Sequence, residues 1–350
     1  MVNDAATVSA RDTLGGFLRL ARFKFLLYNV LPVGLGASVA VHLGVPLDLR
    51  WYLFAQVFAW VVHVMTHYCN EYFDLEADRA NVYYTPWTGG SRALVDGLVK
   101  PETSLAAAFV LWTAGLGLVV AMPTWQSRVL GAVTVTLAWF YTAPPLRFNY
   151  RGLGELTVAA ILNGLWPAVA VLLQAGTVPW LLVAILAPTA VLQTVRMMVM
   201  NLGDRVSDAS VGKRTIPVLI GHDRAVAVIT AGQVLAYGML TAFAVLGWIP
   251  WLVWIAMAAT APMSVWLVLR LRRGDMREVV AEKMTPVVFW ASNHVSLIVG
   301  AALAGMLADI LVNDGTGGGV LVLVGVVAVY AALFGHRLWL ARGRMRRSLV

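Results

Sequence analysis

Ten long apolar segments recur along the 350-residue chain, and they limit its fold more than any other feature. Each is about 17–25 residues long, the length at which an α-helix crosses a ~30 Å hydrocarbon core. An open sheet could not satisfy its edge hydrogen bonds in lipid. The sequence therefore predicts an all-α, polytopic transmembrane helical bundle. We place its helices at residues 24–43, 51–73, 104–122, 126–142, 153–174, 179–200, 224–247, 250–270, 286–308 and 319–338.

The composition agrees with a membrane protein. Hydrophobic residues make up 60% and charged residues 13% of the chain, whereas soluble domains carry about 25% charged residues. The net charge of +8 raises the question of a nucleic-acid partner. With a cytoplasmic N-terminus, however, all of the 26 lysines and arginines except Arg50 and Arg128 fall on cytoplasmic ends and loops. The charge thus indicates topology, with both termini cytoplasmic, and we expect no nucleic-acid partner.

The predicted topology divides the chain into three parts. Residues 1–23 form a polar cytoplasmic segment without the apolar core of a signal peptide, and residues 24–308 form the main bundle. Residues 309–350 add a tenth helix and a basic cytoplasmic tail, whose arginines we expect near anionic lipid head groups.

A polar ladder marks the cytoplasmic end of the second predicted helix. In "HYCNEYFDLEADRAN" (67–81), Asn70, Asp74 and Asp78 follow one another at intervals of four. Residues four apart share one helix face, where like charges cost a few tenths of a kcal/mol. Taken alone, the pattern also fits a solvated helix end.

A second ladder stands at the cytoplasmic end of the sixth predicted helix, where Asn201, Asp204 and Asp208 again combine an amide with two carboxylates. Two ladders on one membrane face indicate a shared cluster of hard oxygen ligands. Mg²⁺ prefers carboxylates, waters and phosphate oxygens, so the ladders predict magnesium ions that bridge a diphosphate.

Basic residues near the ladders are candidates for binding diphosphate oxygens, although some of them serve only as topology signals. Lys213 and Arg214 follow the second ladder, Arg147 lies in the loop after the fourth helix, and Arg22 and Lys24 precede the first.

With these motifs, the chain resembles the UbiA superfamily of intramembrane prenyltransferases. The first family motif is similar to Asn70, Asp74 and Asp78, and the second to Asp204 and Asp208. Three further stretches look like family loops: "GGSRALVDGL" (89–98), "YTAPPLRFNYRGLGEL" (141–156) and the "GKRTIPVLIG" that follows the second ladder. The resemblance covers about residues 15–308. It implies a UbiA-like nine-helix core, from which the tenth helix is a departure.

The resemblance implies Mg²⁺-dependent transfer of a prenyl group from its diphosphate to an electron-rich aromatic acceptor through an allylic cation. The loop at 89–98 favours a quinone-pathway acceptor such as dihydroxynaphthoate. The implied setting is the lipid bilayer of a bacterial plasma membrane, with the active site facing the cytoplasm. The ring face of Tyr141 would stabilise the cation by about 2 kcal/mol. The implied metal ligands are Asn70 and Asn201 with the catalytic Asp74, Asp78, Asp204 and Asp208.

Four polar residues inside the predicted spans are candidates for an acceptor or prenyl pocket: His63, His67, Asn163 and Arg196. Ionisable groups at this depth usually face a cavity, but an interhelical hydrogen bond explains the histidines equally well. Arg196 has three interpretations: pairing with an acidic ladder, holding a carboxylated acceptor, or extending to the membrane surface.

Two other functions use the same features. A UbiA-type terpene cyclase would fold the prenyl cation onto itself without an acceptor, and the ladders do not distinguish it from a transferase. A transporter with an internal repeat would place its polar site near the bilayer midplane, whereas these carboxylates lie at the rim.

Overall fold

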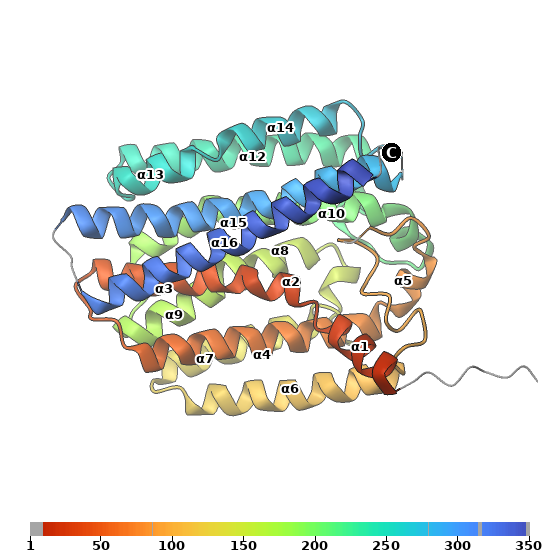
Figure 1. Ribbon diagram of the computed structural model, residues 1–350, viewed down its shortest axis with the longest axis horizontal. Helices are drawn as coiled ribbons and strands as arrows, with labels where there is room; N and C mark the ends of the chain where they lie inside the picture. Colours follow the sequence, from red (N-terminus) through yellow and green to blue (C-terminus); the bar gives the residue numbers. More distant parts are fainter. Residues whose placement is uncertain (1–9, 86, 279, 314–316, 348–350) are drawn as a thin grey trace, which may run out of the picture.

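The computed structural model shows a bundle of long, roughly antiparallel helices (Figure 1). It describes residues 10–85, 87–278, 280–313 and 317–347, without the side chains of residues 10, 24, 337 and 340–347. The described residues contain helices and two isolated β-bridges but no extended strand. The predicted all-α fold is confirmed.

Each of the ten predicted spans corresponds to one helix or to consecutive helical segments. The elements in chain order are α1 (Ala10–Leu20), α2 (Phe23–Leu26), η1 (Leu27–Asn29), α3 (Val30–His42), α4 (Leu49–Phe73), α5 (Leu75–Ala80), α6 (Pro101–Ala121), α7 (Trp125–Phe140), η2 (Phe148–Tyr150), α8 (Gly154–Ala160), η3 (Ile161–Leu165), α9 (Trp166–Ala175), α10 (Trp180–Ser210), α11 (Ile216–Ile220), α12 (His222–Val245), α13 (Trp251–Ala258), α14 (Ala261–Arg272), α15 (Ala281–Val312) and α16 (Gly318–Arg347).

Seven of the described helical segments are long and apolar enough to cross a membrane. The helix at Leu27–His42 is apolar but shorter, and α7 has 16 residues. Helix α4 has 25 residues and carries the polar side chains that lead into the first ladder. Its lower hydropathy therefore reflects residues that face other helices rather than lipid.

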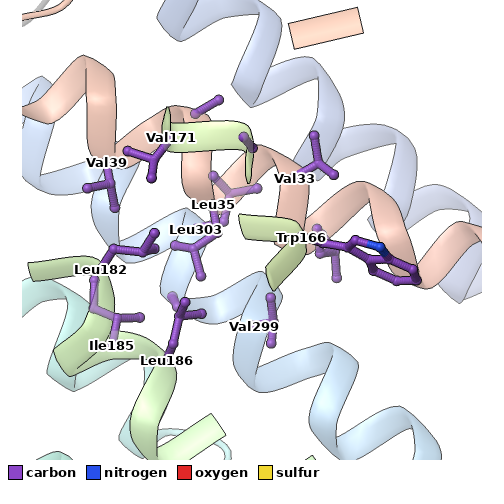
Figure 2. Packing of buried hydrophobic residues seen from close by; sticks show 14 of the residues in the cluster. Val33, Leu35, Val39, Trp166, Val171, Leu182, Ile185, Leu186, Val299 and Leu303 are labelled. Carbon is purple, nitrogen blue, oxygen red and sulfur yellow. The ribbon is translucent and has the colours of Figure 1, made fainter. Parts of the chain in front are cut away.

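The core forms where α3, α9, α10 and α15 meet. Figure 2 shows Leu35 of α3, Val171 of α9, Ile185 of α10 and Leu303 of α15 converging in one apolar cluster. A Cβ at Gly36 would lie 2.2 Å from the carbonyl oxygen of Pro167. Only glycine allows α3 and α9 to approach so closely, which is how small residues bring membrane helices together.

Helix α1 departs from the sequence-based expectation, which gives the N-terminal segment only as a polar tail. A Cβ at Gly16 would lie 2.7 Å from that of Leu98, and the Tyr68 hydroxyl donates to the carbonyl of Phe17 at 3.1 Å. The segment is therefore packed against α4 and the loop before α6. Eleven residues with two glycines give too weak a pattern to predict such a helix.

The tenth span is present as α16, which packs against α3 and α15. It runs to Arg347, beyond the predicted end at residue 338, and its basic tail carries arginines whose side chains lie outside the described part of the chain. Helix α16 ends on the same side of the bundle as α1, α5 and the end of α10 (Figure 1). We call this side the ladder end.

Candidate active site

The first ladder does not stand on one continuous helix, which corrects the sequence-based expectation. Helix α4 ends at Phe73, and Asp74 has a φ of −98° and a ψ of 6° before α5 begins. The backbone bonds from Asp74 N to Asn70 O (2.8 Å) and from Asp78 N to Asp74 O (2.9 Å) nevertheless keep helical spacing. Asn70 donates through Nδ2 to Asp74 Oδ2 at 2.7 Å, so neighbouring rungs still meet.

The second ladder lies on an unbroken helix, because α10 continues to Ser210. Asn81, which directly follows α5, donates through Nδ2 to Oδ1 of Asp204 at 2.7 Å. Helix α5 also packs against α10. The two ladders, which are far apart in sequence, therefore face each other at the ladder end.

A single ammonium joins the two ladders. Lys213 Nζ lies 3.1 Å from Oδ2 of Asp74 and 3.3 Å from Oδ1 of Asp208. Gly212, with a φ of +75°, turns the chain after α10, and Lys213 N donates to Asp208 O at 2.9 Å. Burial alone would lower the pKa of Lys213, but the carboxylates of Asp74 and Asp208 outweigh it and hold the pKa well above its usual value. Lys213 is therefore charged at neutral pH.

The loop after α7 covers the first ladder. Asn149 Nδ2 lies 3.2 Å from both carboxylate oxygens of Asp74. Arg147 stacks its guanidinium 3.6 Å from the ring centre of Tyr150, and its Nη2 lies 3.5 Å from the carbonyl oxygen of Phe73. The predicted diphosphate ligand Arg147 thus lies next to Asp74.

The third rung, Asp78, is crowded by carboxylates. Burial, and then the charges of Glu71 and Asp74, raise the pKa of Asp78 well above the usual carboxyl value, while Arg22 and Lys213 oppose the shift. A Cβ at Gly90 would lie 2.1 Å from Oδ2 of Asp78. The loop after α5 therefore closes directly over this carboxylate.

Comparison with known proteins is consistent with this geometry. The family model described as "UbiA prenyltransferase family" matches residues 29–283. The chain belongs to the UbiA prenyltransferase family. It is an intramembrane prenyltransferase, as the resemblance implied.

Two curated relatives carry the same name, 1,4-dihydroxy-2-naphthoate octaprenyltransferase. The one from Bacillus subtilis is 25% identical over 267 residues, which are 75% of this chain and 84% of the relative. The one from Mycobacterium tuberculosis is 28% identical over 298 residues, or 81% of this chain and 95% of the relative.

Solved structures share the fold. A UbiA homologue from Aeropyrum pernix matches with a TM-score of 0.62 and 20% identity, over 81% of this chain and 98% of that one. A homologue from Archaeoglobus fulgidus, determined with DMAPP and Mg²⁺, matches with a TM-score of 0.56 and 14% identity, over 82% and 98% of the two chains.

The remaining predicted cations of this UbiA-family enzyme differ in their surroundings. Arg22 is engaged with Glu71, since its Nε lies 2.8 Å from Oε1 of that buried carboxylate. It also lines a cavity of about 450 Å³ beside the first ladder, together with Ser91 and Arg92. Arg214 is exposed, and the Lys24 side chain lies outside the described part of the structure.

Tyr141, the ring that the resemblance implies for cation stabilisation, lies in the loop between α7 and η2, where its carbonyl oxygen accepts from the backbone N of Asn149 at 2.9 Å. It follows α7 directly, and a Cβ at Gly154 would lie 3.3 Å from its Cε2. Burial raises the pKa of the Tyr141 hydroxyl, which is also influenced by the charges of Lys213 and Asp74. The ring is therefore neutral and close to the junction of the two ladders.

Several buried residues of the site carry no sequence signal strong enough to predict them. Glu155 accepts from Asn201 Nδ2 at 2.8 Å and from the backbone N of Ile216 at 2.9 Å, so it anchors the second ladder. Glu71 accepts from the backbone N and the Oγ of Ser91, both at 2.7 Å. Glu71 lies inside the first ladder stretch, and Glu155 lies inside the loop at 141–156. Their position inside these motif stretches is the one sequence feature that could have identified them as site residues.

The four pocket candidates fall into two kinds. His63 Nδ1 lies 2.8 Å from Asn29 Oδ1, and His67 Nδ1 lies 2.8 Å from the carbonyl oxygen of Ala21. Both histidines thus have hydrogen bonds between segments, the alternative that explained them as well as a pocket role did. Asn163 and Arg196 instead line a small cavity of about 30 Å³.

Proposed function

We propose that this enzyme transfers a prenyl group from a prenyl diphosphate to a small aromatic acceptor with the help of Mg²⁺. The observation that carries the proposal is the meeting of Asp74 and Asp208, one from each ladder, at the ammonium of Lys213. Such a site combines anchored carboxylates with a fixed cation, and both are needed to bind and release a diphosphate.

The residues at the ladders fit a magnesium ion. Within the ranges that the structure describes, Asp208 Oδ2 is buried without a hydrogen-bond partner, and burial together with the charges of Glu71 and Asp74 raises the pKa of Asp78. Both observations point to missing positive charge. Among the described residues, no three His, Cys, Asp or Glu side chains form a ready metal site. Mg²⁺ usually binds through one or two carboxylates, substrate phosphates and waters, so a preformed cage is not required.

Asn70, Asp74, Asp78, Asn201, Asp204 and Asp208 are the proposed metal-binding residues. Bound Mg²⁺ would supply charge that neutralises the diphosphate oxygens. Lys213 and Arg147 would add fixed positive charge at the same oxygens, with Arg22, Lys24 and Arg214 as outer candidates.

The reaction then proceeds by ionisation. The bond between C1 of the prenyl chain and the diphosphate oxygen breaks, and its electron pair leaves with the diphosphate. The neutral ring of Tyr141 would stabilise the allylic cation, an interaction worth about 2 kcal/mol when desolvated. A ring carbon of the acceptor forms the new bond and afterwards loses its proton. The surrounding helices exclude water, which would otherwise capture the cation.

The names of the relatives support an aromatic acceptor, since two of them are dihydroxynaphthoate octaprenyltransferases. The DMAPP and Mg²⁺ bound to the Archaeoglobus fulgidus homologue support the donor and the metal. The distribution of lysine and arginine supports a ladder end that faces the cytoplasm, and the bacterial source of the two relatives supports a bacterial plasma membrane.

The test uses the full chain in lipid nanodiscs. Prenyl diphosphates of several lengths are incubated with and without 1,4-dihydroxy-2-naphthoate, in Mg²⁺ or in excess EDTA. We expect a prenylated naphthoate and stoichiometric diphosphate in Mg²⁺, and neither in EDTA. A cyclic hydrocarbon formed without an acceptor would identify a terpene cyclase instead. Equal turnover in EDTA would refute the metal dependence.

A further inference from the structure

A second, deeper cavity lies between the helices on the core side of the ladders. It has a volume of about 30 Å³, and its walls come from η1, α3, η3, α9, α10 and α15. A volume of 10–15 Å³ accommodates about one water molecule. The cavity is therefore large enough for a small polar group but not for an aromatic ring.

Four of the polar side chains that line it carry a hydrogen-bond donor without a partner. In the described part of the chain, Arg196 Nε, Gln193 Nε2, Asn163 Nδ2 and Trp166 Nε1 are buried and unsatisfied. Guanidinium and indole nitrogens can only donate, and the two amides can turn to present either end. These side chains are 2–8% exposed, so bulk water does not satisfy them. Figure 2 shows the indole of Trp166 at the edge of the core cluster, and the same residue lines this cavity.

Arg196 provides a charge that the protein does not neutralise. Its Nη2 lies 3.3 Å from Ser292 Oγ and its Nη1 lies 3.3 Å from Met197 Sδ, both of which are neutral acceptors. In the part of the chain that the structure describes, Arg196 forms no ion pair with a carboxylate. An ionisable residue within a membrane helix is normally paired or functional.

We propose that Arg196, Gln193, Asn163 and Trp166 form a subsite for the ionised carboxylate of the aromatic acceptor. This inference rests on the proposed prenyl transfer and specifies which acceptors it uses. A carboxylate supplies both the missing negative charge and two oxygens that accept several hydrogen bonds, and guanidinium binds it in a forked geometry. A hydroxyl or quinone oxygen would leave the charge of Arg196 uncompensated.

The position along α10 suits this role. Arg196 precedes Asp204 by eight residues, which is about 12 Å along a helix. A fused-ring acid whose carboxylate occupied the cavity would extend its ring from Arg196 toward the ladder, where C1 of the donor ionises. Met197 lies beside Arg196 and Met200 beside Ser292, and their flexible side chains can move to admit a ring.

Replacement of Arg196 should have an unusual effect on stability. A buried charge without a partner destabilises the ligand-free protein, so replacing Arg196 by methionine should leave its melting temperature unchanged or higher. A purely structural arginine would behave in the opposite way. The carboxylate subsite is therefore distinguishable from a structural role before any reaction is measured.

The experiment measures equilibrium binding of 1-hydroxy-2-naphthoate and of 1-naphthol to the full chain in nanodiscs, without donor. The wild type should bind the acid about 10–100-fold more tightly than the naphthol, the range expected for hydrogen bonds to a charged group. Arg196→Met should abolish this preference and leave naphthol binding unchanged, whereas Arg196→Lys should retain part of it. Gln193→Leu should weaken acid binding several-fold. If the Arg196→Met variant does not fold, this loss of acid binding tests the carboxylate subsite in its place.

Thr189→Val is the matched control, since Thr189 is buried on the same helix and its hydroxyl donates to the carbonyl of Leu186, away from the cavity lining. Wild-type acid preference in Arg196→Met, or equal loss of both probes, would overturn the subsite. Because no donor is present, the outcome is independent of the reaction. If the acid binds in an Arg196-dependent way but the separate turnover test with donor gives no prenylated product, the proposed function is refuted and the subsite still stands.

Discussion

The ammonium of Lys213 lies 3.1 Å from Oδ2 of Asp74, although the two residues are 139 positions apart in sequence. The same ammonium lies 3.3 Å from Asp208, so one side chain holds the two ladders together. In the absence of metal it supplies the positive charge that this cluster of carboxylates requires. We infer that Lys213 keeps the ladders in place until the donor and its metal ions bind.

Replacing Lys213 by methionine should therefore have two separate effects. Turnover should fall about 10²–10³-fold, the usual effect of removing one electrostatic contact to a developing charge. The metal-free protein should lose about 3–5 kcal/mol, because Asp74 and Asp208 would keep their buried charges without the cation that pairs with both. Diphosphate release and thermal unfolding measure the two effects.

Arg224→Met is the control, since this cation near the start of α12 is exposed and belongs to no proposed site. It should retain nearly wild-type turnover and stability. If both variants lose activity equally, general positive charge rather than the specific position of Lys213 is responsible.

Neutralising one rung of either ladder should abolish turnover while preserving the fold. Asp74→Asn and Asp208→Asn keep the size of the side chain but remove a carboxylate from the proposed metal site. We expect less than about 0.1% of wild-type prenyl transfer, with normal melting in detergent. Asp96→Asn, at an exposed position in the loop before α6, should be fully active. Substantial turnover in either ladder variant contradicts the metal assignment.

Much of this site could be predicted from the sequence because its main signals are local. The spacing of Asn70, Asp74 and Asp78 and its repetition at Asp204 and Asp208 require only helical periodicity to interpret. The membrane spans likewise follow from runs of apolar residues. These patterns depend on neighbours within a few residues, which the linear sequence shows directly.

The remaining features depend on contacts between distant segments. The sequence does not reveal that Arg22 pairs with Glu71 or that Asn201 donates to Glu155, because neither pair has a fixed spacing. The break at Asp74 is also tertiary in origin: it occurs where Lys213 and Asn149 bind this carboxylate. For the same reason, the unpaired state of Arg196 becomes visible only once its neighbours are known.

The crowding of Asp78 should make stability depend on pH and metal. Burial and the charges of Glu71 and Asp74 raise its pKa in the folded protein, so over the pH range above about 4 the folded state binds more protons than the unfolded state. The free energy of unfolding of the metal-free protein should therefore decrease as pH rises through this range. Added Mg²⁺ should reduce the decrease, because it favours the ionised carboxylate.

Asp78→Asn isolates this contribution. In EDTA, its stability should change less with increasing pH than that of the wild type, since asparagine cannot ionise. Thermal unfolding of both proteins over the same pH series, with and without Mg²⁺, gives the comparison. Parallel curves for the two proteins would show that Asp78 ionises normally.

Gly90 should be required for activity because of its contact with Asp78. Alanine at this position would place its Cβ 2.1 Å from Oδ2 of Asp78 and would also adopt a φ of +77°. Gly97 provides the matched control, since it has a φ of +71° and a Cβ added there would meet no atom within 4 Å. Both alanine variants should lose about 1–2 kcal/mol from backbone strain, but only Gly90→Ala should displace the carboxylate and reduce prenyl transfer. Equal activity of the two variants, measured as diphosphate release at saturating donor, would separate Asp78 from the reaction and restrict the metal site to the other rungs.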